Sequence, residues 1–97
     1  MNTSNRTPLH VEKEEIDNLK FPNEEVLQST DDIGKREMEI NRALTLGNLE
    51  HSKIKIIFED SEGLKKVETT IWGVTDKRII LKQGIVLPIH RIHELKI

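Results

Sequence analysis

The pair His90 and His93 is the nearest approach to a metal-binding motif in this chain of 97 residues. Imidazoles at positions i and i+3 eclipse one another in a 3₁₀ turn, where both rings are able to meet one metal ion. A zinc site needs three or four ligands, however, and only His10 and His51 remain as further imidazoles. The alternative is that the pair is polar surface bracketing a buried Ile92. The sequence therefore predicts no metal site and no cofactor, with His90 and His93 as weak candidates.

No arrangement of nucleophile, base and phosphate loop marks this chain as an enzyme. The chain has no cysteine, which excludes thiolate chemistry and a disulfide framework. Adjacent carboxylates occur at 24–25 and 31–32, near predicted helix starts, where acidic side chains complement the helix dipole. No glycine-rich phosphate loop is present. We therefore predict that the protein is not an enzyme.

The net charge of −2 averages two unlike halves of the chain. Residues 1–50 hold 6 Lys or Arg and 11 Asp or Glu, whereas residues 51–97 hold 9 and 6. A basic second half is compatible with contacts to phosphate, but two Phe and one Trp give few rings on which bases stack. A solvated charged surface is the competing interpretation. The candidate RNA-binding residues are Lys53, Lys55, Arg78, His90 and Arg91.

Residues 1–29 are predicted to form a flexible acidic arm. Residues 1–10 are polar and bury too little apolar surface to offset the entropy lost on ordering. Sparse apolar residues over 11–29 hint at a short helix that stops near Phe21, because Pro22 disfavours helical geometry in the residue before it. Residues 30–97 are then predicted to form one domain of a helix and a small β-barrel.

The strongest helix signal covers residues 31–46. Thr30 or Asp31 is expected to cap its start, with acidic side chains at the positive end of the helix dipole. Gly47 predicts the end of the helix, because glycine adopts the left-handed cap conformation at little cost. The apolar face at helical spacing comprises Ile33, Ile40, Ala43, Leu44 and Gly47.

From residue 53 onward apolar and polar residues alternate with the period of two that is typical of β-strands. We expect a bend at Gly73 and a single 3₁₀ turn over 88–92, because Pro88 cannot donate to a strand ladder. The pattern predicts a mainly β, α+β fold: a five-stranded SH3-like or Sm-like small barrel preceded by an N-terminal α-helix. Closure would remove exposed strand edges. The predicted strands cover 53–59, 65–74, 78–82, 85–87 and 93–97.

Three large apolar residues are out of phase with the predicted barrel core. Strand parity places Trp72, Ile57 and Ile80 on the outer face, where an apolar group needs a cover. Helix 31–46 is one candidate cover. The other is a protein partner, since Trp often anchors interfaces. We therefore take Trp72, Ile57 and Ile80 as candidate interaction residues.

Several segments of the second half carry a resemblance to a known family. They are LGNLEH at 46–51, ETTI at 68–71, WGVTDKRIIL at 72–81 and IVLPIHRI at 85–92. Together they resemble a family of small uncharacterised proteins of Bacteroidetes-type bacteria. The resemblance covers about residues 40–97 and implies a shared module without an activity.

Two further families are similar in part. The order of helix, bent strand, turn and final strand resembles the Sm-like RNA chaperones of bacteria. That resemblance implies that His90 lies at an RNA-binding pore. The stretch VTDKRII at 74–80 is similar to a strand motif of bacterial pleckstrin-homology-like domains, a fold that needs further strands and a closing helix.

The sequence as a whole favours a binding protein. We predict a non-catalytic small-barrel module that mediates protein–protein contacts, including contacts with its own copies. The alternative is an Sm-like RNA-binding protein. A cytoplasmic location is expected, because the apolar runs are too short for a membrane span and the N-terminus lacks a signal-peptide pattern.

Overall fold

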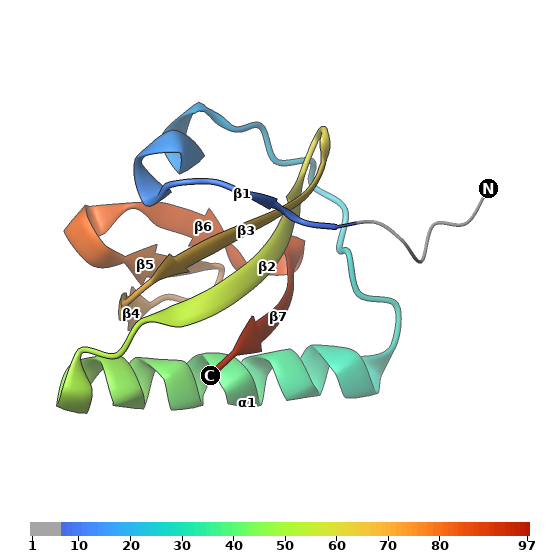
Figure 1. Ribbon diagram of the computed structural model, residues 1–97. Helices are drawn as coiled ribbons and strands as arrows, with labels where there is room; N and C mark the ends of the chain where they lie inside the picture. Colours follow the sequence, from blue (N-terminus) through green and yellow to red (C-terminus); the bar gives the residue numbers. More distant parts are fainter. Residues whose placement is uncertain (1–6) are drawn as a thin grey trace.

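The computed structural model describes residues 7–97 as an α+β fold with one long helix and two sheets (Figure 1). A mixed four-stranded sheet has the order β1-β3-β2-β7, and an antiparallel three-stranded sheet has the order β4-β5-β6. No helix in the described residues is long and apolar enough to cross a membrane. The elements are β1 (Leu9–His10), η2 (Lys13–Asn18), α1 (Thr30–Glu50), β2 (Ile54–Asp60), β3 (Gly63–Thr69), β4 (Ile71–Val74), β5 (Arg78–Leu81), η3 (Lys82–Gly84), β6 (Val86–Pro88), η4 (Ile89–Arg91) and β7 (Ile92–Lys96).

Helix α1 forms where its spacing predicts it, but both its cap and its end differ from the prediction, since Ser29 takes the capping position expected of Thr30 or Asp31. Ser29 caps the start by accepting a hydrogen bond from the Asp32 N–H at 3.0 Å. The prediction that Gly47 ends the helix is wrong, because the helix continues to Glu50 and ends at His51, whose φ is 54°. A Cβ on residue 47 would lie 2.5 Å from the carbonyl oxygen of Ile71. Gly47 therefore allows the helix backbone to approach β4.

The strand segments and the 3₁₀ turn before the last strand follow the predicted order, with one correction. The expected strand 65–74 is divided at Thr70, so β3 belongs to the four-stranded sheet and β4 to the three-stranded sheet. The Thr70 hydroxyl donates to the His51 carbonyl at 3.3 Å, which ties this corner to the end of α1. The chain therefore changes sheet at Thr70, and a register shift of the β4–β5 ladder lies between Ile71 and Gly73, where the sequence predicted a bend.

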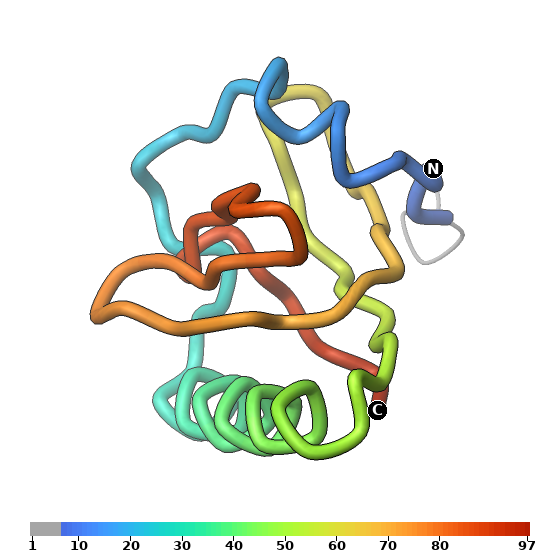
Figure 2. The backbone as a smooth tube through the Cα atoms, turned by 90° about the vertical axis from the view of Figure 1, so that its left-hand side faces the viewer, coloured from blue at the N-terminus to red at the C-terminus, as the bar shows by residue number. Residues whose placement is uncertain are grey.

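The predicted closed barrel is not found in residues 7–97, because no ladder joins β6 to β7. Helix α1 instead packs against both β4 and β7 and spans the opening between the sheets (Figure 2). The Leu95 N–H donates to Glu39 Oε1 at 3.1 Å, and Arg36 donates to the Ile92 carbonyl at 3.0 Å. Side chains of α1 thus form hydrogen bonds with main-chain groups of β7 that would pair with a neighbouring strand in a closed barrel.

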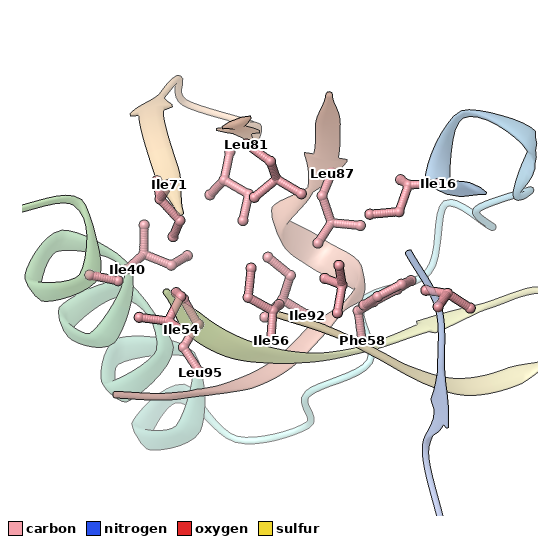
Figure 3. Close-up of a cluster of buried hydrophobic side chains, with 14 residues drawn as sticks. Ile16, Ile40, Ile54, Ile56, Phe58, Ile71, Leu81, Leu87, Ile92 and Leu95 are labelled. Carbon is pink, nitrogen blue, oxygen red and sulfur yellow. The ribbon is translucent and has the colours of Figure 1, made fainter. Parts of the chain in front are cut away.

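The core lies between the two sheets and is closed at one end by α1 (Figure 3). Inward side chains of every long strand meet there, and Ile40 and Ala43 join them from the helix. Phe58 is the largest fully buried side chain. The core residues with the lowest exposure are Ile16, Ile56, Phe58, Val67, Ile71, Ile79, Leu81, Leu87 and Ile92.

The expectation of a flexible arm over 1–29 is corrected for its described part. The Val11 N–H donates to the Lys66 carbonyl at 2.9 Å, and Val11 and Ile16 are both buried in the core. The rings of Phe21 and Phe58 stand 6.0 Å apart. Burial of these apolar groups offsets the entropy of ordering that the arm prediction depended on. Residues 1–6 lie outside the described residues.

Candidate functional site

The two weak metal candidates, His90 and His93, point to different partners. The ring Nε2 of His90 donates to the Pro22 carbonyl at 2.9 Å, whereas the Nε2 of His93 lies 2.9 Å from Glu59 Oε1. The 3₁₀ turn η4 ends at Arg91, so His93 lies in β7 and the eclipsed geometry of one turn is not formed. Within residues 7–97 no three His, Cys, Asp or Glu side chains gather as a metal site would require.

Two of the candidate RNA-binding residues are engaged in internal contacts. Arg91 is 5% exposed, and its guanidinium donates to the carbonyls of Glu59 and Glu24 at 2.9 and 2.8 Å. His90 donates to the Pro22 carbonyl, as described above. Both side chains therefore hold the segment 19–27, which we call the strap, against the sheets.

The remaining RNA candidates lie on different sheets. Exposed Lys55 is on β2, with Glu68 opposite it on β3 and Lys96 on β7. Lys53 precedes β2, and Arg78 begins β5 in the other sheet. The five candidates therefore do not form one phosphate-binding surface.

The strap is held most strongly by Arg36, a residue that the sequence analysis did not single out. Its guanidinium, 4% exposed, makes two hydrogen bonds to the Glu25 carboxylate at 2.6 and 2.7 Å. Burial alone would raise the pKa of Glu25, but hydrogen bonds from Arg36 and the Leu27 N–H outweigh it and lower that pKa. The signal was the position of Arg36 between Ile33 and Ile40 on the apolar face of the helix.

The three candidate interaction residues do not share one surface. Ile57 is buried but lies outside the core cluster, on the outer side of the four-stranded sheet, flanked by Lys66 and Glu94 on the neighbouring strands. Ile80 is half-buried and Trp72 is 53% exposed in the three-stranded sheet. Helix α1 leaves more than half of Trp72 exposed, and Ile40 and Ala43 of the helix join the core instead.

A β-bulge places Trp72 on the surface. Ile71 is opposite Leu81 and Gly73 is opposite Ile80, so Trp72 is the extra residue between two ladder positions. Ile79 and Leu81 are fully buried, and alternation therefore turns Ile80 away from the core beside Trp72.

This exposed side of the three-stranded sheet, the outer face, continues across β6. Val86 is opposite Ile80 and is 42% exposed, and Pro88 is opposite Arg78. The strands β4, β5 and β6 contain no acidic residue, whereas the strands of the other sheet contain four: Glu59, Asp60, Glu68 and Glu94. The outer face is thus an apolar row with a basic side chain next to it.

Two adjoining cavities open beside this face. The larger, ≈ 520 Å³, is bounded by the strap, the turn between β4 and β5, and η4. The smaller, ≈ 370 Å³, reaches from η2 to Val86 on β6. Both are lined by Asn23, Arg78, Pro88 and His90, so the cavities and the outer face form one continuous surface.

Comparisons of this chain with protein-family models, curated proteins and solved structures gave no significant match. The functional argument therefore depends on the geometry of the outer face and of the cavities next to it. Sequence parity had pointed to Trp72 and Ile80. The cavities depend on the strap, whose docking the sequence did not indicate.

Proposed function

We propose that the protein is a non-catalytic binding module that docks a protein partner on the outer face. The observation that carries this proposal is the exposure of Trp72 at the bulge, next to Ile80 and Val86. Tryptophan is among the residues most enriched at the energetic centres of protein interfaces. Apolar groups gathered on a monomer surface mark such interfaces more often than isolated ones do.

The RNA-binding alternative has less support than protein docking. Single-stranded RNA is held by several stacked rings together with a basic track. Phe58 is fully buried and Phe21 packs against it, which leaves Trp72 as the exposed ring among the Phe and Trp residues of the described part of the chain. Of the five basic candidates, only Arg78 lies on the outer face with Trp72.

We further infer that the two sheets are an open relative of the SH3-like or Sm-like barrel. As in such barrels, one helix is followed by a series of strands, a 3₁₀ turn (η4) precedes the last strand, and that last strand, β7, pairs with the first strand after the helix, β2. The contacts of Arg36 and Glu39 with β7 occupy a strand edge that edge-to-edge assembly would need. These contacts favour docking on a sheet face over assembly through β7.

Site-specific photocrosslinking in cells tests the proposed function. A photoreactive amino acid at position 82, directly after β5, is expected to capture a discrete protein. The same group at position 68, on the exposed side of β3, is the matched control and should not capture it. Trp72→Ala should abolish capture from position 82 without unfolding the chain. Capture of RNA, or equal capture from both positions, would contradict protein docking on the outer face.

A further inference from the structure

Two exposed cations, Lys77 and Arg78, lie at the edge of the outer face. Within the described residues neither Lys77 nor Arg78 forms an ion pair. Both line the 520 Å³ cavity. A guanidinium in such a position favours a carboxylate, which it can bind through two hydrogen bonds.

The charges of the cavity itself favour an anionic group. Arg36 and Glu25 line the cavity but satisfy one another through two hydrogen bonds. This leaves Lys77 and Arg78 against the single carboxylate of Asp76. The 520 Å³ cavity therefore has one more cation than carboxylate in its lining, next to an outer face whose strands carry no acid. The adjoining 370 Å³ cavity has Arg78 and one carboxylate, Asp17, on its η2 side.

The edge of β6 favours an extended ligand. The Leu81 N–H donates to the Ile85 carbonyl, so alternation directs the main-chain groups of Val86 away from β5. The 370 Å³ cavity runs beside this edge, between Val86 and η2. An extended segment lying there is able to pair with Val86, and every second side chain of the segment then lies on the side of the outer face.

We propose that the partner docks through an extended acidic segment. One of its carboxylates enters the cavity at Arg78 and Lys77, and an apolar side chain packs on Trp72, Ile80 and Val86. Arg78 and Ile80 are two residues apart on β5, about 7 Å along the strand. The acidic and apolar residues of the segment are therefore about two positions apart. This inference rests on the proposed function and adds the chemical class of the partner.

A library of random hexapeptides displayed on phage tests this inference with the full-length protein as bait. We expect recovered peptides to carry Asp or Glu about two positions from a large apolar residue. Their affinity should fall at least ten-fold with Arg78→Glu and with Trp72→Ala. Lys55→Glu, on the outer side of the other sheet, is the matched charge control and should change affinity less than two-fold. Arg78 and Lys55 are both exposed, so melting temperatures should confirm that these variants fold.

The outcomes separate the two proposals. One contrary result would be recovered peptides that lack an acidic residue and lose affinity with Trp72→Ala but not with Arg78→Glu. That result would overturn the acidic segment and leave docking on the outer face intact. Failure to recover any peptide that depends on Trp72 would overturn both. Concentration-dependent dimerisation that buries Trp72 would make a second copy the occupant and would also overturn the acidic segment.

Discussion

Helix α1 contains two glycines for which alanine should have opposite effects on stability. Gly34 is exposed, and a Cβ there would meet nothing within 4 Å. Alanine at an exposed helix interior is favoured over glycine by about 1 kcal/mol, so Gly34→Ala should raise the free energy of unfolding by about that amount. At Gly47 a Cβ would lie 2.5 Å from the Ile71 carbonyl oxygen and 3.2 Å from Thr70 Cγ2.

The contact with Ile71 is with main chain, so no side-chain rotation relieves it. Overpacking of this kind costs about 1–3 kcal/mol and is larger where backbone must move. We take the clash at the upper end of this range, about 3 kcal/mol. The preference of helices for alanine over glycine offsets about 1 kcal/mol of it, so Gly47→Ala should lower the free energy of unfolding by about 2 kcal/mol. The two variants should thus differ by about 3 kcal/mol, or roughly 12–24 °C in melting temperature for a domain of this size.

Thermal and urea unfolding followed by far-ultraviolet circular dichroism would measure both variants under identical conditions. The urea dependence of the free energy should be unchanged, since neither variant alters the surface exposed on unfolding. If Gly47→Ala were as stable as Gly34→Ala, the close approach of α1 to β4 would be refuted. The helix would then lack the close contact with β4 by which it spans the opening between the sheets.

Three other predictions concern segments that support the site. Ile16→Ala should destabilise by about 2–5 kcal/mol in urea unfolding, because the side chain is 1% exposed in the core; a change below 0.5 kcal/mol would show that the N-terminal segment does not dock. His51→Gly should stabilise by about 0.5–1 kcal/mol, since His51 has a φ of 54°; calorimetry showing a lower melting temperature would contradict that left-handed cap. Burial alone would raise the pKa of Asp60, but hydrogen bonds from Lys65 and from the main-chain N–H groups of the turn outweigh it and lower that pKa, as with Glu25. The stability that these carboxylates contribute is therefore full above their ordinary pKa values and is lost as the pH falls below about 4. Asp60→Asn should flatten the pH dependence of the free energy of unfolding in urea. An unchanged dependence on pH would argue against the lowered pKa of Asp60.

The strands could be predicted from the sequence because their signal is local. Alternation with a period of two placed Ile54, Ile56 and Phe58 on one side, and they share the core. The same parity placed Trp72 outside, where the structure has it. Ile57 was grouped with Trp72 because alternation within a strand does not reveal that the chain changes sheet at Thr70.

The errors arose where long-range contacts decide the structure. A glycine in a helix signals either an end or a close approach, and only the position of Ile71 distinguishes them at Gly47. The docking of the strap depends on Arg36 meeting Glu25, 11 residues away, and on Arg91 meeting the Glu24 carbonyl, 67 residues away. The cavities beside the outer face exist because the strap docks, so the sequence did not indicate them.

The most direct test of docking on the outer face uses the fact that Trp72 is the single tryptophan of the chain. Incorporation of 5-fluorotryptophan gives one ¹⁹F resonance that reports on this surface. We predict that lysate of the source cells shifts or broadens this resonance, that ribonuclease treatment of the lysate preserves the effect, and that protease treatment of the lysate removes it. An unchanged resonance in untreated lysate, or an effect that ribonuclease removes, would contradict a protein partner at Trp72.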